Sequence, residues 1–266
     1  MNARVNFEAM NFNPVDVPSS MLETVKKNGL SEERLPFTVR MVRNEEQLEK
    51  AVYIRQSAYG RHLKALAEVL KQPEPSDRED GSVVLLAESK LDGSPLGTIR
   101  LHSNRYKKLP LEDSVNLPEW LQGKSIAEAT RLGVCLSAVG QVVKTALFKG
   151  FLGYCAEHDI EWMVCTGRSP LDRQYRSLGY EDIFPEQGFI PMRHVGNIPH
   201  RVMALQVPMV EPRWAATKHP LYDFFFRTYH PDIAVVGTEA VVGRELVSPN
   251  VCVQKAKSYR DVAMAA

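Results

Sequence analysis

Two segments that have the character of buried strands contain charged side chains. Arg100 lies in GTIRL, and Glu128 and Arg131 lie in EATRLGV. A charge buried in such a segment destabilises the fold unless an opposite charge and hydrogen bonds accompany it. We expect the segments to pair as antiparallel strands in a register that sets His102 near Ser125 or Ile126. That register brings Arg100 near Ala127 or Glu128, so we predict a cross-strand ion pair between Arg100 and Glu128.

A β-bulge is needed to bring Glu128 and Arg131 into one site. The two residues are three apart, so on a regular strand they face opposite ways. A bulge inserts one residue and turns the following side chains to the other face. The loop DRED supplies Asp77 and Asp80, either of which is the natural partner of Arg131. We therefore predict a partly buried charge network, which could also have a purely structural role.

Hydrophobic periodicity predicts the elements that must position these residues. Strands are expected at 37–43, 82–90, 95–102, 125–136, 161–166, 180–184 and 200–207, and helices at 45–63, about 139–158 and 169–179. Asn44 should cap the first helix, and Ser169, Pro170 and Gly179 should bound the third. The order β-α-β-β-β-α-β-α-β-β predicts an α/β (α+β) chain with a mixed sheet and helices on both faces.

The two ends of the chain do not share this pattern. Residues 1–36 are expected to form an N-terminal arm with one short helix at 19–29. Residues 212–229 are rich in aromatic side chains and predict one further helical segment, and the tail beyond Pro231 has weak strand-like pieces. We therefore divide the chain into an arm, 1–36, a central domain, 37–210, and a C-terminal extension, 211–266.

The segment QYRSLGYED places Tyr175 four residues before Gly179, and RLGVCL leads directly into the long helix. Both features resemble the GNAT (N-acetyltransferase-like) acyltransferase superfamily. The resemblance implies a three-layer α/β/α fold with a central mixed, mostly antiparallel, splayed sheet. It also implies that Tyr175 is a catalytic acid that protonates the departing thiolate. The alternative is that its ring only fills the gap between a helix and the sheet.

The loop before the long helix, SAVGQVV, has a single glycine. Enzymes of the superfamily that use acetyl-CoA place a glycine-rich cradle for the pyrophosphate there. The sequence resembles instead, over about residues 37–207, the branch of acyl-homoserine lactone (autoinducer) synthases and N-acyl amino acid synthases. The residues that match this branch are charged or aromatic and come in the expected order: Arg55, Tyr59, Asp77, Asp80, Arg100, Glu128 and Arg131.

The resemblance implies a fatty acyl-phosphopantetheine thioester as donor, on acyl carrier protein or as acyl-CoA, and a small amine such as an amino acid as acceptor. No permanently bound cofactor is expected. Glu128 is the candidate base that removes a proton from the amine, directly or through water. Arg55 could bind the carboxylate of an amino acid, or could be structural. A backbone N–H at Val134 or Cys135 is the candidate donor to the thioester carbonyl.

Basic side chains are the candidate docking surface for an acidic carrier protein, although each could be an ordinary surface charge. They are Arg105, Lys107, Lys108, Lys144, Lys149, Arg168, Arg173 and Arg176. The candidate lining of an acyl channel, with ordinary core as the alternative, is Val134, Leu136, Leu147, Phe151, Met163 and Val164.

Composition limits the alternatives. The 266 residues have a formal charge of +1, so no nucleic-acid partner is expected. No window approaches the roughly 18 apolar residues of a membrane span. Without a signal peptide and with Cys135, Cys155 and Cys165 interpreted as core thiols, a cytoplasmic location is expected. The histidines show no metal-binding spacing, so no metal site is predicted.

Three other functions stay open at this level. The chain could be an acyl-homoserine lactone synthase that uses S-adenosylmethionine as acceptor, or an acetyltransferase that uses CoA. It could also be a non-catalytic module that binds acyl lipids or a carrier protein.

Overall fold

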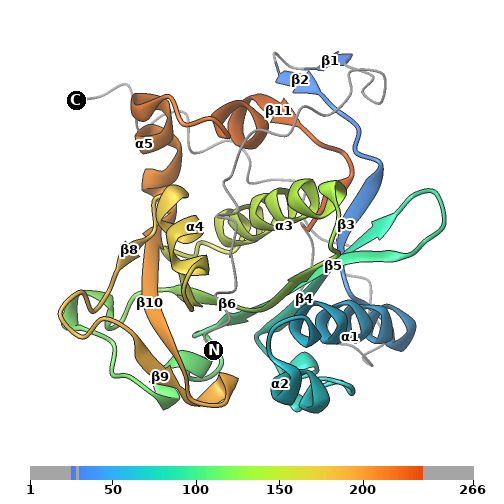
Figure 1. Ribbon diagram of the computed structural model, residues 1–266. Coiled ribbons are helices and arrows are strands. Elements are labelled where there is room, and N and C mark those ends of the chain that lie inside the picture. Colours follow the sequence, from blue (N-terminus) through green and yellow to red (C-terminus); the bar gives the residue numbers. More distant parts are fainter. Residues whose placement is uncertain (1–24, 28–29, 236–266) are drawn as a thin grey trace, which may run out of the picture.

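A nine-stranded sheet lies at the centre of the structure, a computed structural model that describes residues 25–27 and 30–235 (Figure 1). Its order is β12-β3-β4-β5-β6-β7-β10-β8, and β9 pairs with β10. The strands are β3 (Phe37–Met41), β4 (Ser82–Ser89), β5 (Pro95–Ser103), β6 (Ile126–Val134), β7 (Trp162–Gly167), β8 (Glu181–Asp182), β9 (Ile190–Met192), β10 (Ile198–Gln206) and β12 (Ile233–Ala234). Neighbours are antiparallel except for β12 with β3 and β6 with β7, so the predicted mixed, mostly antiparallel sheet is confirmed.

Helices cover both faces of this sheet (Figure 1). They are α1 (Glu45–Gly60), α2 (Lys64–Val69), α3 (Ala138–Glu157), α4 (Leu171–Ser177) and α5 (Val210–Thr217). Alternate residues of β4 show the two sides, because Val83 and Leu85 belong to the core under α3 while Val84 and Leu86 pack with α1. The three-layer α/β/α arrangement is therefore confirmed. Among the described helices, none is long and apolar enough to cross a membrane.

Local signals in the sequence account for some of the helix ends. The Asn44 side chain accepts a hydrogen bond from the Gln47 N–H and begins α1, as predicted. Gly179 ends the α4 region with a φ of 90°, a conformation that glycine adopts without strain. The prediction that Ser169 caps α4 is wrong: the helix begins at Leu171, which puts Pro170 in the cap position without a side-chain cap bond.

The sheet splits between β6 and β7. These strands pair only where Ile126–Ala129 lies beside Trp162–Cys165. Beyond that point β6 continues to pair with β5 as far as Val134, and β7 continues to pair with β10 as far as Gly167. The two halves of the sheet therefore diverge, which is the predicted splay.

The bulge in β6 is also confirmed, but the predicted register is wrong by two or three residues, because His102 pairs with Glu128 and not with Ile126 or Ser125. Arg100 pairs with Thr130 and Thr98 pairs with Gly133, so one residue of β5 faces two of β6. Arg131 is one of these two, and its φ of 54° shows the strained backbone of the bulge. The register is set by Asn104, whose backbone N–H donates to the Ile126 carbonyl and whose side chain accepts from the Ile126 N–H.

The segment between β5 and β6 covers the face of the sheet opposite α3. It forms two 3₁₀ turns, η3 (Pro110–Asp113) and η4 (Glu119–Leu121). Leu111 and Leu121 are fully buried against Ile126 of β6 and Val164 of β7. This cover, α2 and β9 were not predicted, because short turns and a three-residue strand have no clear periodicity.

The arm and the C-terminal extension meet in a small second sheet. It consists of β1 (Val25–Lys27), β2 (Leu30–Glu32) and β11 (Thr228–Tyr229). The helix predicted at 19–29 is thus wrong for 25–27; its other residues lie outside the described part, as do Cys252 and the tail after residue 235. The helix predicted at 212–229 is interrupted, because Lys218 adopts a left-handed φ of 52° and ends α5 before a π-helical turn, η7 (Asp223–Arg227).

Candidate functional site

Three arginines and two carboxylates form a buried cluster on the α1 side of the sheet, called here the charge network: Arg55, Glu74, Asp77, Arg100 and Arg131. Arg55 is fully buried, and its two Nη atoms donate to the two Asp77 carboxylate oxygens at 3.0 and 2.9 Å. Arg100 Nη1 donates to Asp77 and to Glu74, both at 3.0 Å. Arg131 binds Glu74 through Nε and Nη2, both at 2.7 Å. A buried charge network therefore exists as predicted, but Glu128, which was predicted to belong to it, does not bond to these five residues.

A short turn presents both carboxylates. Residues Pro75–Asp77 form a 3₁₀ turn, η2, in which the Asp77 carboxylate accepts a hydrogen bond from the Glu74 N–H at 2.8 Å. Burial alone would raise the pKa of both carboxyl groups, but bound arginines lower each to about 2: Arg131 for Glu74, and Arg55 for Asp77. Both are therefore ionised at neutral pH, and each carboxylate is shared by more than one guanidinium.

The membership of the network corrects two predictions. The partner of Arg131 is Glu74, not Asp77 or Asp80, and Asp80 lies on an exposed part of the loop. Arg55 was a candidate for binding a substrate carboxylate, but both of its Nη atoms are held by Asp77 inside the protein. Glu74 was missed, although its spacing of three residues before Asp77 is that of a capping box.

Glu128 lies near this network without belonging to it. The predicted Arg100–Glu128 ion pair is absent: Glu128 pairs with His102 across the strands, and its Oε2 accepts from the Leu111 N–H at 2.9 Å. Its Oε1 has no hydrogen-bond partner within the described part of the chain. Complete burial raises the pKa of Glu128 to about 8, against the lowering effects of the Leu111 hydrogen bond and the Arg100 charge. The carboxyl group is therefore mostly protonated at neutral pH.

His194, which the sequence analysis missed, lies beside Glu128. Its Nε2 is 3.9 Å from Glu128 Oε1 and 3.4 Å from Thr166 Oγ1. Its backbone carbonyl accepts a hydrogen bond from Arg131, and its ring lines the cavity described next. Burial and the positive charge of Arg131 lower the pKa of His194 to about 4, so the ring is neutral. No sequence pattern marks this histidine, which follows β9 on a short turn.

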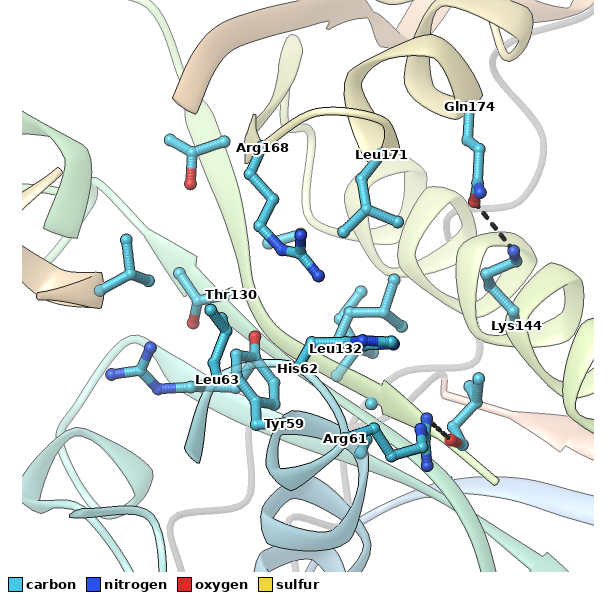
Figure 2. Close-up of a pocket in the computed structure, with 18 of the residues that line it drawn as sticks. Tyr59, Arg61, His62, Leu63, Thr130, Leu132, Lys144, Arg168, Leu171 and Gln174 are labelled. Carbon is cyan, nitrogen blue, oxygen red and sulfur yellow. Dashed lines mark hydrogen bonds between the residues drawn. The ribbon is translucent and has the colours of Figure 1, made fainter. Parts of the chain in front are cut away.

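A cavity of about 290 Å³ occupies the splay between β6 and β7 (Figure 2). It is lined from the α1 side of the sheet by Tyr59 and His62, and from the opposite side by Phe148 of α3 and Leu171 of α4. The cavity thus passes through the sheet at the point where the strands separate. Of the residues predicted for the site, Tyr59, Arg131, Val134, Cys135 and Tyr175 line it.

Tyr175 lies on the α4 wall of the cavity. Its ring packs edge-on against Phe148, with 5.9 Å between centroids. Burial raises the pKa of the Tyr175 phenol above its usual value, so the hydroxyl stays protonated. Gly167 makes room for this ring, because a Cβ there would lie 2.8 Å from a ring carbon of Tyr175.

Val134 and Cys135 present different backbone edges. The Cys135 N–H donates to the Leu96 carbonyl at 2.8 Å, so it is not available to a ligand, and this part of the prediction is wrong. The Val134 carbonyl points away from β5, because it accepts a hydrogen bond from Arg61 of the α1 side at 2.8 Å. In an antiparallel ladder the N–H and C=O of one residue point to the same side. The Val134 N–H therefore faces the splay.

The charged side chains that line the described cavity are all basic. Arg61, Arg131, Lys144 and Arg168 line it, and no Asp or Glu does so among the described lining residues. Figure 2 shows Arg168 and His62 extending into the same space from opposite walls. Partial burial lowers the pKa of His62, and so do the charges of Arg168 and Arg61. Arg168 has no ion pair within the described residues, so this part of the cavity is suited to an anionic group.

The structure also tests the predictions for docking residues, channel residues and core cysteines, and it supports only some of them. Lys149 is not a docking residue, because it donates to the Phe224 and Thr228 carbonyls of the extension. Lys144 is buried and donates to Gln174 at 3.0 Å. Of the predicted channel residues only Val134 and Leu136 line the cavity, whereas Leu147, Phe151, Met163 and Val164 are core. Cys155 and Cys165 are buried free thiols as expected, but Cys135 lines the cavity.

The fold agrees with that of a known enzyme. The chain is similar to the structure of FeeM, an N-acyl amino acid synthase from uncultured soil microbes, with 20% identity and a TM-score of 0.54, over 68% of this chain and 96% of that one. It is also similar to BjaI, a CoA-dependent acyl-homoserine lactone synthase, with 13% identity and a TM-score of 0.47, over 74% of this chain and 97% of that one. No family model and no curated protein matches the sequence. The likeness to FeeM confirms the predicted GNAT-type fold.

Proposed function

We propose that the protein is an N-acyltransferase that moves a fatty acyl group from a thioester to the amine of an amino acid or a similar small molecule. The observation that carries this proposal is the cavity in the splay, which reaches both faces of the sheet beside the protonated phenol of Tyr175. Two substrates can enter such a cavity from opposite sides and meet in the middle. Most of the rate acceleration would come from this proximity.

The chemistry needs one proton removed and one supplied. The amine nitrogen attacks the thioester carbonyl carbon, the C–N bond forms, the C–S bond breaks, and the thiolate leaves. In this proposal the Val134 N–H stabilises the developing oxyanion, and Tyr175 gives its proton to the thiolate. In the fraction of molecules in which Glu128 is ionised, a fraction that grows as the pH rises toward 8, its carboxylate accepts the amine proton by way of His194 and water. A carboxyl group with a pKa of about 8 is a far stronger base than an ordinary one.

Acyl carrier protein is the proposed donor. The N-terminus of α3 faces the cavity, since Ser137 and Gln141 line it. One of the backbone N–H groups in the first turn of α3 already has partners inside the protein. The Gly140 N–H donates to both the side chain and the carbonyl of Ser137. A pyrophosphate needs several such N–H groups pointing outward. A phosphopantetheine arm on a carrier protein lacks the pyrophosphate and does not need them.

The carboxylate of an amino acid is the proposed anionic group of the acceptor. Arg168, with His62 and Arg61 nearby, replaces Arg55 in this role because its guanidinium lies in the cavity and has no ion pair within the described residues. A planar guanidinium suits a carboxylate because it donates two parallel hydrogen bonds. FeeM, which shares the fold, is an N-acyl amino acid synthase, in line with such an acceptor.

The test is a transfer assay with defined donors. The purified protein is incubated with a mixture of amino acids and either acyl carrier protein or CoA that bears the same long acyl chain. We expect N-acyl amino acids in the mass spectrum and faster release of thiol from the carrier protein. A strong preference for acetyl-CoA would overturn the proposed donor, and an acyl lactone formed with S-adenosylmethionine would overturn the proposed acceptor. No transfer from any donor would leave the binding-module alternative.

A further inference from the structure

His200 of β10 lines the cavity and has no part in the proton route described above. The residue is buried, and its Nδ1 lies 2.7 Å from the Ile198 carbonyl oxygen. A carbonyl oxygen can only accept, so Nδ1 carries the hydrogen of the neutral ring and Nε2 carries the lone pair. Within the described residues Nε2 has no hydrogen-bond partner, and it is not sealed inside the protein. The backbone therefore holds this ring with a proton acceptor available to the cavity.

The register of β7 and β10 brings His200 next to Arg168, the residue proposed to bind the acceptor carboxylate. Arg201 pairs with Gly167, so one step further along the ladder His200 lies opposite Arg168. Residues opposite each other in an antiparallel pair have their side chains close together on one face. In an α-amino acid a single carbon atom separates the carboxylate from the amino group. An acceptor whose carboxylate is bound by Arg168 therefore has its nitrogen within reach of His200.

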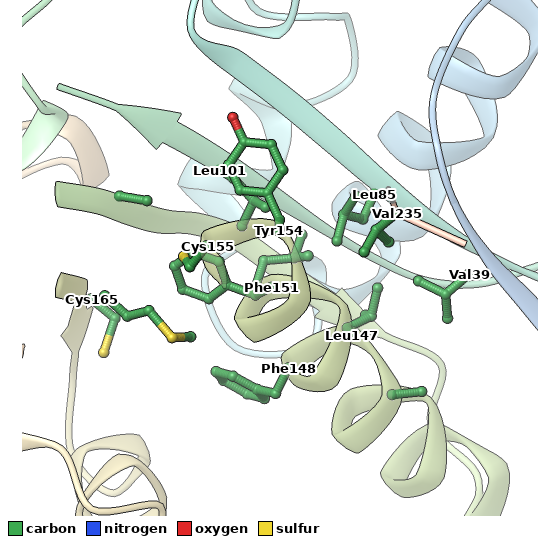
Figure 3. Close-up of a cluster of buried hydrophobic side chains, with 14 of the residues drawn as sticks. Val39, Leu85, Leu101, Leu147, Phe148, Phe151, Tyr154, Cys155, Cys165 and Val235 are labelled. Carbon is green, nitrogen blue, oxygen red and sulfur yellow. The ribbon is translucent and has the colours of Figure 1, made fainter. Parts of the chain in front are cut away.

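Alternation along β10 shows that His200 lies on the same face of the sheet as Glu128. Val202, two residues further on, packs with Leu111 of the segment between β5 and β6, and the Leu111 N–H binds Glu128. Met203 points to the opposite face and belongs to the apolar cluster under α3, part of which Figure 3 shows. His200 is thus on the face where the proposed mechanism handles the amine, away from the apolar core.

The proton route described above begins from a neutral amine, whereas an amino acid carries its nitrogen as an ammonium group at neutral pH. An ammonium nitrogen has no lone pair and cannot attack a carbonyl carbon. It must lose one proton before the C–N bond forms and a second proton when the amide is completed. Glu128 and His194 are assigned to the proton lost in bond formation. The earlier proton needs another acceptor.

We propose that His200 is a catalytic base that removes this first proton from the bound ammonium group. The inference rests on the proposed function, because it needs an amino acid as acceptor. The N–H bond breaks, its electron pair stays on nitrogen as the lone pair that attacks the thioester carbonyl carbon, and the proton moves to Nε2. The imidazolium that forms gives this proton to water, so His200 is neutral again before the next turnover.

The surroundings of His200 keep the ring neutral until the acceptor binds. Burial lowers the pKa of His200, the hydrogen bond to the Ile198 carbonyl raises it, and the charge of Arg168 lowers it again. The carboxylate of an acceptor offsets the charge of Arg168, so it makes His200 a stronger base in the complex than in the free protein. Further titratable groups lie around the same part of the site: Tyr59, His62, Glu128, Arg131 and His194.

The pH dependence of acyl transfer tests this role, with the donor and the amino acid that the transfer assay identifies. His200→Asn keeps a side-chain N–H for the Ile198 carbonyl and removes the base. At pH 7 kcat should fall roughly a hundredfold to ten-thousandfold, with little change in KM for the amino acid. Above pH 7 the rate of the variant should rise by about tenfold per pH unit, because a growing fraction of the amino acid is already neutral. A side chain that only fills space would lower the rate by the same factor at every pH.

His158→Asn is the matched control, because His158 lies at the C-terminal end of α3 and does not line the cavity. Its pH profile should equal that of the parent. Transfer by His200→Asn with the pH profile of the parent would overturn the inference and keep the enzyme. If the parent transfers no acyl group from any donor, the proposed function is wrong and the inference is lost with it.

A second measurement needs neither a donor nor a variant of His200. The pKa of His200 is followed by NMR in the full-length protein, with and without the carboxylic acid that corresponds to the acceptor without its amino group. This acid should bind Arg168 and raise the pKa of His200, and the rise should be absent in Arg168→Ala. An unchanged pKa in the parent saturated with the acid would show that His200 does not lie beside the bound carboxylate, and would also overturn the inference.

Discussion

The charge network and the cavity lie next to each other on β6, and both are rich in arginine. They differ in whether the arginines have carboxylate partners. In the network every guanidinium meets Glu74 or Asp77 at hydrogen-bond distance. In the cavity Arg61 and Arg168 have no carboxylate partner within the described residues. Buried charges that neutralise each other support the fold, whereas cations held without a counterion are available for an anionic ligand.

Arg131 belongs to both regions. Its side chain binds Glu74 in the network, while its backbone forms the bulge and lines the cavity. Residues 131 and 132 form the bulge, and Val134 follows it with a backbone edge that faces the splay. The network thus holds the strained backbone that orients the reactive part of β6. The charge network therefore affects the cavity, although its carboxylates do not line it.

Loss of a network carboxylate should have the largest effect. Asp77→Ala removes the partner of two buried arginines, Arg55 and Arg100. Breaking a buried ion pair from one side typically costs about 3–5 kcal/mol, since the other charge is left unpaired. The free energy of unfolding, measured by urea denaturation, should fall by that amount. The nearby exposed Asp80→Ala is the control and should change it by less than about 0.5 kcal/mol. Equal values for both variants would show that the network does not stabilise the fold.

The next largest effect is expected from a substitution in the cavity, Tyr175→Phe, which should not alter the charge network. Tyr175→Phe keeps the ring that packs on Phe148 but removes the proposed proton donor. A positioned acid contributes roughly a hundredfold to ten-thousandfold to a rate. The single-turnover rate should therefore fall by that factor while the melting temperature stays constant. Full activity in Tyr175→Phe, together with unfolding of Tyr175→Ala, would assign the ring a packing role only.

The contrast between the two regions also explains what could be predicted from the sequence. The strands and helices predicted between residues 37 and 210, the bulge and the cap at Asn44 follow from periodicity and local residue chemistry, and these are present. The partners of the arginines do not, because Glu74 lies in a polar loop that resembles an ordinary surface segment. The register depends on Asn104, whose role appears only when the loop between β5 and β6 is closed.

Only part of the cavity lining could be predicted, because only some of its residues lie on regular elements. Val134 and Tyr175 lie on regular elements with a recognisable pattern, and both line it. Arg168 and His194 follow strand ends on irregular segments, where neither period nor spacing indicates the direction of a side chain. Their place depends on tertiary packing around the splay.

Glu128 offers a test between the two regions, because within the described residues it is buried without a charged hydrogen-bond partner. Its folded-state pKa of about 8 lies above the unfolded value of 4.5. Its contribution to stability is therefore fully present below about pH 4.5 and is lost as the pH rises through 8, at about 1.4 kcal/mol per pH unit in between. Glu128→Gln keeps an acceptor for the Leu111 N–H and removes the titration. Unfolding curves at several pH values should show that the free energy of unfolding of the parent falls relative to that of Glu128→Gln as the pH rises. Parallel pH profiles would mean that Glu128 is paired after all.

The smallest predicted effect is that of Arg168→Ala, which tests whether a cavity cation that has no ion pair within the described residues serves a substrate. A hydrogen bond to a charged group contributes about 1.5–3 kcal/mol, which corresponds to roughly ten- to a hundredfold in affinity. Arg168→Ala should raise the KM for an amino acid by this factor and change kcat much less. Arg173, an exposed arginine on α4, follows Arg168 in the chain but does not line the cavity, so Arg173→Ala should leave KM unchanged.

A second acceptor decides whether the carboxylate is what Arg168 recognises. The amine that corresponds to the amino acid without its carboxylate should be a poor substrate for the parent, and Arg168→Ala should handle both acceptors equally. If the variant still prefers the amino acid by the same ratio as the parent, the carboxylate is bound elsewhere, with Arg61 the next residue to test. If the KM of both acceptors rises together, Arg168 supports the shape of the cavity without reading the charge. One outcome supports the proposal: Arg168→Ala loses the preference for the amino acid over the amine, and the KM for the amine does not change. That result would mean that Arg168 binds the carboxylate of the substrate.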